Sequence, residues 1–349
     1  MPRSDLLTLT PRGLYCPSGD FHVDPWEPVD RAIVTHAHSD HARPGSRRYL
    51  TTPQGRVVLQ RRMGEDAQVD TLPYGESLSL GDVQISLHPA GHLLVSAQVR
   101  VEHQGEVWVV SGDYKTAADP TCEPLEPLRC DVFISESTFG LPIYRWPEPQ
   151  SVIDDIRAWW QANRDEGLVP ILFTYALGKA QRVIASLGEG PGPILCHGAV
   201  EAVNACYRAS GVHLPPTAVV QTSVGKKSWA GALVVAPPSA MGSPWLRKFG
   251  DVSTGFASGW MLVRGTRRRK AMDRGFVLSD HADWTGLRET IHATGAQRVL
   301  ITHGATSAMS RYLREQGLDA NVLQTRFEGE VDEIDGAEGE PEAAGGAAT

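Results

Sequence analysis

The alternation of hydrophobic and polar positions changes twice along the chain. Between residues 83 and 135, short apolar runs separated by polar turns predict strands at residues 83–88, 94–102, 107–110 and 131–135. From about residue 148 to residue 275, apolar strands alternate with helices instead. After residue 276 the first pattern returns. We therefore expect one α/β fold that is interrupted by a second.

The middle segment has the pattern of a small parallel-sheet domain. Helices are predicted at residues 152–163 and 179–187, strands at 168–175, 194–196 and 233–236, and the segment 201–209 continues the alternation. Beyond it, a strand at 276–278, a helix after Trp284 and a strand at 298–301 are predicted. The expected domains are one discontinuous domain, residues 1–147 and 276–327, an insertion, 148–275, and a tail, 328–349.

The negative charge of the chain is concentrated in that tail. The formal net charge is −8, and residues 328–349 hold eight acidic side chains and no basic one, so residues 1–327 are formally neutral. Because the tail is rich in Glu, Gly and Ala and nearly lacks large apolar residues, we expect it to be disordered. A basic run, Arg264 with residues 267–270, is either a phosphate contact or a solvated loop.

Neither a membrane anchor nor a disulfide framework is expected. No stretch of about twenty uncharged apolar residues occurs, and the first residues lack the pattern of a signal peptide. The five cysteines are odd in number and contain no Cys-x-x-Cys pair, which favours reduced, mostly buried thiols. These features predict a soluble, cytoplasmic protein.

The strongest chemical signal is a cluster of metal ligands at residues 36–41. His36, His38, Asp40 and His41 follow the apolar run 32–35, where a strand passes into a loop. Side chains alternate along a strand, so His36 and His38 face one way while Asp40 and His41 address a second ion. Imidazoles and a carboxylate suit zinc or manganese. Further candidate residues that also follow apolar strands are His92, Asp113, Glu136, His281 and His303.

This arrangement resembles the metallo-β-lactamase fold, whose HxHxDH signature corresponds to residues 36–41. Residues 135–140, 279–284 and 302–304 resemble the three additional motifs of the β-CASP nucleases, which carry an inserted domain between the first two. The implied fold is an α/β metallo-β-lactamase αββα sandwich with an inserted β-CASP α/β domain. Residues 15–17, 24–26, 37–42 and 258–261 are most similar to the bacterial ligase-associated DNA exonucleases. The resemblance covers residues 10–325.

The resemblance implies a role for each strand-end residue. One metal ion is held by His36, His38 and His92, the other by Asp40, His41 and His303, and Asp113 bridges them. Asp24 orients the ligand loop from behind the ligands.

It also implies the catalytic groups of a phosphodiesterase. Asp40 orients the attacking water or accepts its proton, His281 protonates the departing sugar oxygen, and Glu136 steers His281.

Contacts to nucleic acid are predicted where small residues expose the backbone. Gly178 and Lys179 join a strand to a helix N-terminus, where phosphate binds well. Ser258 and Gly259 form a second such segment, and Lys115 is a further phosphate candidate. The first two segments are equally consistent with packing turns.

The resemblance implies a metal-dependent DNA exonuclease in DNA repair. Its substrate would be single-stranded or end-processed DNA, its cofactors two divalent ions (Zn or Mn), and its partners a DNA ligase and a helicase. The alternative is a β-CASP ribonuclease, because RNA-cleaving β-CASP enzymes carry a histidine at the position of His303. A small-molecule hydrolase such as a lactonase and a catalytically silent scaffold are the remaining alternatives.

Overall fold

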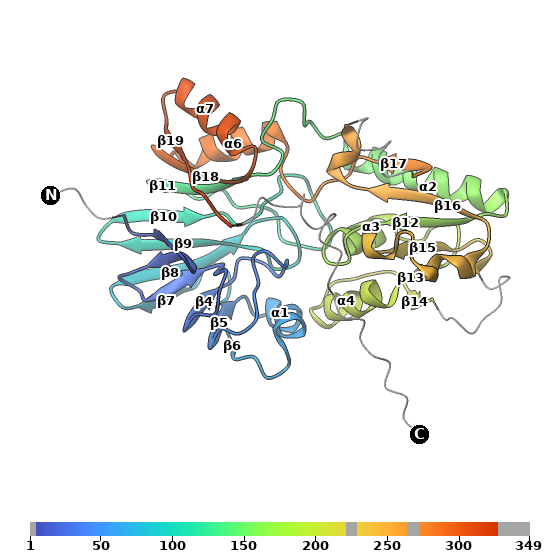
Figure 1. Ribbon diagram of the computed structural model, residues 1–349, viewed down its shortest axis with the longest axis horizontal. Helices are drawn as coiled ribbons and strands as arrows, with labels where there is room; N and C mark the ends of the chain where they lie inside the picture. The colour runs from blue at the N-terminus through green and yellow to red at the C-terminus, as the bar shows by residue number, and fades with distance from the viewer. Residues whose placement is uncertain (1–4, 221–228, 264–271, 327–349) are drawn as a thin grey trace.

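A computed structural model describes residues 5–220, 229–263 and 272–326 of the chain (Figure 1). The strands in these residues form three sheets, two in one half of the molecule and the third in the other. The predicted acidic tail and the predicted basic run lie outside the described residues.

The first sheet is built from short strands near the N-terminus. Its order is β1 (Thr8–Thr10), β2 (Gly13–Cys16), β3 (Phe21–Val23), β4 (Arg31–Ile33), β5 (Arg48–Thr51) and β6 (Val69–Thr71). β1, β2 and β3 are antiparallel, and β3 to β6 are parallel. The parallel strands direct the chain so that β3 and β4 both end toward the ligand loop.

The second sheet is mixed. Its order is β19 (Asp319–Val322), β18 (Arg298–Gly304), β11 (Val132–Ser137), β10 (Glu106–Val110), β9 (Ala97–His103), β8 (Val83–Pro89) and β7 (Ser77–Leu80). Strands β19, β18, β11 and β10 pair in parallel, and the others are antiparallel. Because β10, β11 and β18 run the same way, the residues that follow them meet at one edge.

The two sheets pack face to face, with helices on both outer faces. Phe21, Val99 and Trp108 belong to the apolar core between the sheets. Helix α1 (Gly55–Met63) packs on the first sheet through Val58 and Leu59. On the outer face of the second sheet lie α6 (Trp284–Thr294) and α7 (Thr306–Glu315). This is the αββα sandwich of the metallo-β-lactamase fold, as predicted.

The segment from α2 to β17, called the insertion below, forms an entirely parallel sheet. Its order is β14 (Thr217–Val219), β13 (Ile194–Cys196), β15 (Leu233–Ala236), β12 (Val169–Phe173), β16 (Val252–Ala257) and β17 (Arg274–Phe276). One face is covered by α2 (Pro149–Asp165), α3 (Lys179–Leu187) and α4 (Gly198–Ala209). The other packs against short 3-10 helices: η2 (Pro238–Ala240), η3 (Pro244–Phe249) and η4 (Gly259–Leu262).

The insertion and the sandwich share one apolar core. The cluster that contains Val58 and Leu59 of α1 continues through the residues of α2, α3 and α4. Helices α1 and α4 are in contact, and the Tyr207 hydroxyl accepts a hydrogen bond from the Leu94 amide at 3.3 Å. The insertion is therefore seated directly against the loops at the sheet edge where the predicted ligands lie.

Most predicted elements are present in the structure, although several begin or end two or three residues away from the predicted bounds, and two of these differences have a local cause. The strand predicted from residue 94 begins at Ala97, because the Ser96 amide donates to the Leu93 carbonyl and Val95 has a φ of +60°. The strand predicted at 276–278 is β17 and ends at Phe276, where the Leu278 amide turns back to the Phe276 carbonyl at 3.1 Å.

The structure also describes the helices and the cysteines on which the membrane and disulfide predictions depend. Among the helices that the structure describes, none is both long and apolar enough to span a bilayer. All five cysteines are free thiols, of which Cys16, Cys196 and Cys206 are buried.

Candidate metal centre and active site

The ligand loop after β4 is held in place by Asp24. This residue follows β3 and has a φ of +45°, a conformation that aspartate tolerates better than most residues. Its carboxylate accepts hydrogen bonds from the Thr35 amide at 2.8 Å and the Thr35 hydroxyl at 2.6 Å. The same carboxylate accepts from His41 Nδ1 at 2.8 Å. Asp24 thus fixes both ends of the loop, in the position predicted for it.

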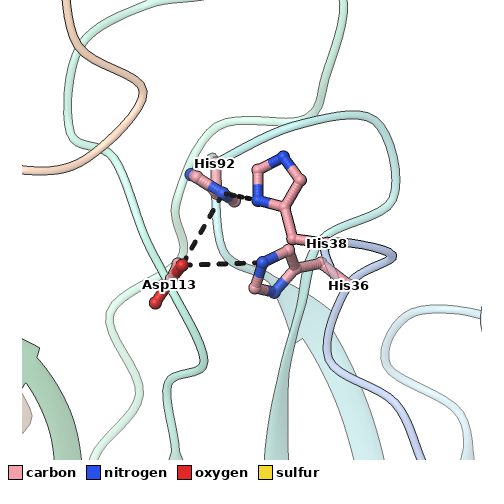
Figure 2. A group of neighbouring side chains, drawn as sticks. All are labelled: His36, His38, His92 and Asp113. Atoms are coloured by element: carbon pink, nitrogen blue, oxygen red, sulfur yellow. Dashed lines mark hydrogen bonds and ion pairs between the residues drawn. The ribbon is translucent and has the colours of Figure 1, made fainter. Parts of the chain in front are cut away.

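A first group of ligand atoms comes from three separate strand ends. It contains His36, His38, His92 and Asp113, whose ligand atoms all lie within 4.8 Å of one another (Figure 2). Asp113 Oδ2 is 3.5 Å from His36 Nε2 and 3.9 Å from His92 Nε2. His38 Nδ1 lies 3.1 Å from His92 Nε2.

A second group shares Asp113 with the first. It contains His41, Asp113 and His303, with ligand atoms again within 4.8 Å. Asp113 Oδ2 is 3.5 Å from His41 Nε2, and Asp113 Oδ1 is 3.7 Å from His303 Nδ1. Asp40 Oδ2 lies 3.5 Å from His41 Nε2. Five of the predicted ligands therefore gather around Asp113, and Asp40 joins them through its contact with His41.

The hydrogen bonds of the ligand histidines leave unprotonated ring nitrogens facing the interior of the ligand group. His92 Nδ1 donates to the Asp280 carbonyl at 2.8 Å, and His38 Nε2 donates to the Leu177 carbonyl at 3.2 Å. In the neutral tautomers that these bonds select, the two facing nitrogens, His38 Nδ1 and His92 Nε2, are both acceptors. Two lone pairs 3.1 Å apart repel unless a cation lies between them. His36 Nδ1 similarly contacts the Thr35 hydroxyl at 3.1 Å.

Buried polar atoms without hydrogen-bond partners also indicate a cation site. Among the described residues, His36 Nε2, His41 Nε2 and Asp113 Oδ1 are buried and have no hydrogen-bond partner. Such atoms are costly unless something satisfies them. Each is a normal ligand atom for a divalent metal ion. The residues present therefore fit divalent metal binding.

The electrostatics of the first group favour neutral imidazoles at His36 and His92. Burial lowers the pKa of His36 well below its ordinary value, and the nearby His41 lowers it further. Burial likewise lowers the pKa of His92, assisted by His281 and His38. A neutral imidazole is the form that binds a metal.

Asp113 and His41 behave as a charged pair. Burial opposes ionisation of Asp113, but His41 and His281 outweigh it and hold the pKa of this carboxyl well below its usual range. Burial also opposes the charged form of His41, but Asp40 and Asp113 raise the pKa of this imidazole well above its ordinary value. The acidic groups around His41 therefore favour a positive charge at this position.

A third group links Asp113 to the predicted general acid. His281 Nδ1 donates to both carboxylate oxygens of Glu136, at 3.0 and 2.9 Å, and lies 4.0 Å from Asp113 Oδ2. Glu136 is held in turn by the Tyr114 amide at 2.8 Å. The Trp146 indole donates to the His281 carbonyl at 2.9 Å. The predicted pairing of His281 with Glu136 is thus present, with both side chains buried.

The predicted nucleic-acid contacts lie mostly inside the protein. Lys115 and Lys179 are buried and lie 3.9 and 3.8 Å from the Asp280 carboxylate. The Gly178 amide donates to the Gln181 side chain at 2.8 Å, which caps α3. This placement favours the packing interpretation of the segment.

Ser258 and Gly259 are also buried. The Ser258 hydroxyl accepts from the Trp260 amide at 3.3 Å. A Cβ on Gly259 would lie 2.7 Å from the Phe139 ring and 2.9 Å from the Trp146 ring. The glycine therefore permits close packing beside His281, which again favours a packing turn.

Four groups around the site were not predicted. They are the Leu177 carbonyl, which accepts from His38, and the side chains of Arg182, Asp119 and Asp280, which form ion pairs with one another. Two of them had a signal in the sequence: Asp280 precedes His281, and Arg182 follows Lys179 by three residues, on the same face of a helix. Nothing in the sequence pattern indicates a partner for a backbone carbonyl.

Comparisons with known proteins found relatives that are named as a DNA ligase and as ribonucleases. No protein-family profile matches the chain. It is 32% identical over 312 residues to a "Probable DNA ligase" from Opitutus terrae, covering 88% of this chain and 30% of that protein. It is 29% identical over 191 residues to "Ribonuclease TTHA0252" from Thermus thermophilus, covering 47% of this chain and 44% of that protein. An "RNase J-like protein" from Methanocaldococcus jannaschii is 26% identical over 179 residues, 45% of this chain and 42% of the relative.

The chain thus spans less than half the length of each of these relatives. A solved structure described as a protein of unknown function from Enterococcus faecalis V583 matches with a TM-score of 0.56 at 11% identity, over 85% of this chain and 79% of that one. That likeness concerns the fold alone. The relatives and the sandwich together support the metallo-β-lactamase superfamily, with the insertion of the β-CASP type.

Proposed function

We propose that this protein is a metal-dependent DNA exonuclease that acts in DNA repair. The observation that carries the proposal is the sharing of Asp113 by three groups of ligand or acid residues, each with atoms within 4.8 Å. Such a site joins two metal positions to a histidine–carboxylate pair. In the proposal, zinc or manganese occupies both positions, and residues 148–275 form the inserted domain, whose last strand, β17, ends one residue further on at Phe276.

The ligand residues divide between the two positions. His36, His38 and His92 would hold one ion, and Asp40, His41 and His303 the other, with Asp113 between them. When bound, two divalent ions supply an activated water and withdraw charge from a phosphoryl oxygen. Asp40, at the rim of the second group, orients that water or accepts its proton.

The remaining step is protonation of the leaving sugar oxygen, which we assign to His281. Its Nδ1 is fixed on Glu136, so Nε2 is the nitrogen that delivers the proton. Glu136 stabilises the protonated ring and sets its orientation. Phe139, whose ring centroid lies 5.9 Å from that of His281, packs beside the acid.

The choice of DNA is supported by how the relatives align. The ligase relative matches 88% of this chain, through both the sandwich and the insertion, whereas the two ribonuclease relatives match less than half of it. Since this chain covers only 30% of the ligase relative, we propose that the nuclease works beside a DNA ligase, and with a helicase that exposes single strands. The proposed location is the cytoplasm.

Matched DNA and RNA oligonucleotides test this proposal. Each is labelled at one end, offered with Mn²⁺ or Zn²⁺, and its products are resolved by length over time. Stepwise shortening of DNA is the expected result, and an Asp113→Ala variant should show none. Faster turnover of RNA, or lactone hydrolysis without oligonucleotide cleavage, would contradict the proposal.

A ribonuclease is the second candidate, because one observation favours it. His303 lies 3.7 Å from Asp113 and completes the second group, as the resemblance to RNA-cleaving enzymes implies. Several relatives are also named as ribonucleases. The same oligonucleotide assay decides between the two.

A further inference from the structure

Five charged side chains are buried together where the insertion meets the sandwich. This junction cluster consists of Lys115, Asp119, Lys179, Arg182 and Asp280, each with a side chain no more than 4% exposed. Lys115 Nζ donates to the Asp119 carboxylate at 2.5 Å. Arg182 donates to the Asp280 carboxylate at 3.1 Å and to the Ser279 carbonyl at 2.6 Å.

The members come from three parts of the chain. Lys115 and Asp119 belong to the loop after β10 in the sandwich, and Lys179 and Arg182 to the first turn of α3 in the insertion. Asp280 lies on the segment that returns from the insertion to the sandwich. Removing one partner from such a buried group leaves a charge uncompensated, which is strongly unfavourable. The cluster therefore fixes the insertion in one position.

The same segments orient two of the predicted ligands. The Asp280 carbonyl accepts from His92 Nδ1 at 2.8 Å, and Lys115 Nζ donates to the His92 carbonyl at 3.0 Å. The Leu177 carbonyl, just before α3, accepts from His38 Nε2 at 3.2 Å. Both outer nitrogens are thus held by backbone that the junction cluster positions.

The second group of ligands is held differently. His41 is oriented by Asp24, which lies in the sandwich and has no contact with the cluster among the hydrogen bonds and ion pairs of the described residues. Displacement of α3 or of the return segment would therefore move His38 and His92 but leave His41 in place. The two metal positions differ in what supports them.

We propose that the junction cluster couples the seating of the insertion to the affinity of the first metal position, the one formed by His36, His38 and His92, with Arg182 as a positioning residue. The inference rests on the metal centre of the proposed function and adds that the two positions respond unequally. Arg182 acts through Asp280 and Ser279, and contacts neither metal nor substrate.

Single-position backgrounds separate the two metal sites. A His41→Ala protein retains the first position, and a His38→Ala protein retains the second. In each background, Zn²⁺ affinity is measured by competition with a chromophoric chelator, with and without Arg182→Met. Loss of a supporting partner typically weakens metal binding by about 10- to 100-fold. We expect a loss of at least about tenfold in the His41→Ala background and less than about twofold in the other.

The matched control is Arg208→Met. Arg208 also lies in the insertion and pairs with Glu201 at 2.9 Å, but it belongs to α4, and its hydrogen bonds go to Glu201, Pro215 and Thr217 and not to a ligand residue. It should change neither affinity. Arg182→Lys keeps the charge and provides the measurement if Arg182→Met does not fold. Arg182 faces Asp280 with Nη1 at 3.1 Å and Asp119 with Nε at 3.7 Å, and a single ammonium cannot occupy both positions, so the same unequal loss is expected.

Each remaining outcome has a definite meaning. Equal weakening in both backgrounds, or none in either, would overturn the inference. Zn²⁺ binding with the expected inequality but no oligonucleotide cleavage would contradict the proposed function while supporting the inference. A parent chain that binds no Zn²⁺ would overturn both.

Discussion

Replacement of His281 by alanine tests the assignment of the general acid. The His281 ring is 2% exposed and the Glu136 carboxylate is fully buried, so their hydrogen bonds of 2.9 and 3.0 Å lie in a medium that screens charge poorly. A positioned general acid contributes about 10²- to 10⁴-fold to the rate. This corresponds to about 3 to 5 kcal/mol in the barrier. We expect His281→Ala to lower kcat on DNA by such a factor.

Glu136→Gln should have a smaller effect. It keeps a polar group beside His281 but removes the charge that stabilises the protonated ring. A hydrogen bond to a charged group contributes about 1.5 to 3 kcal/mol, which predicts a loss of about 10- to 100-fold.

The assay compares two leaving groups. DNA releases a basic alkoxide that needs a proton, whereas a nucleotide p-nitrophenyl ester releases a stable phenolate that needs little help. His281→Ala should therefore lose much less activity on the p-nitrophenyl ester than on DNA. Bound metal, measured by elemental analysis, should stay unchanged, and His292→Ala, an exposed histidine of α6, is the control. Equal losses on both substrates would refute the assignment of His281 as the acid.

Three further results are expected. Asparagine tolerates the left-handed backbone conformation of residue 24. Asp24→Asn should weaken metal binding at the second position by about 10- to 100-fold, as measured by chelator competition in a His38→Ala background. Unchanged affinity would contradict the role of Asp24. Dialysis against a chelator should abolish nuclease activity, and Mn²⁺ or Zn²⁺ should restore it; activity that survives complete metal removal would exclude the proposed chemistry. Burial opposes ionisation of Asp280, but Lys179, Lys115 and Arg182 hold its pKa far below the ordinary value. Below about pH 4, the Asp280 carboxyl therefore binds a proton in the unfolded chain but not in the folded chain. The contribution of the Asp280 ion pairs to the free energy of unfolding is consequently lost in acid. Urea unfolding should show that Asp280→Asn is less stable than the parent protein at pH 7 and that its free energy of unfolding decreases less steeply below about pH 4. An unchanged dependence of this free energy on pH would argue against the ion pairs.

The residues that gather around Asp113 were candidates on sequence alone, because each lies at or near the end of an apolar run. His92, Asp113 and His303 are far apart in the chain, yet parallel strands bring strand ends to one edge. Their convergence follows from the topology that the resemblance implies. The pairing of His281 with Glu136 follows in the same way.

Elements with weak patterns were not predicted. Helix α1 has Gly55, Val58 and Leu59 as its buried residues, and α7 has Met309, Ser310 and Leu313. Strand β16 contains a serine, a threonine and a glycine, although most of its length is buried in the insertion sheet. Such segments are fixed by tertiary contacts and not by their own periodicity.

The junction cluster shows a second reason why sequence-based prediction of the site was incomplete. Lys115 was a candidate phosphate contact, and Lys179, at a helix N-terminus, was either a phosphate contact or part of a packing turn. In the structure they face Asp280, and only the docking of the insertion places that carboxylate between them. Burial of a charge depends on partners distant in sequence, which local patterns do not encode.

The central claim is that ligands from distant strands surround a pair of cations. Anomalous diffraction from crystals soaked in Mn²⁺, recorded at the manganese edge, tests it most directly. The account predicts two peaks about 3.5 to 4 Å apart, one beside His36, His38 and His92 and the other beside His41 and His303, with Asp113 touching both. Peaks located elsewhere, or none among these side chains, would contradict it.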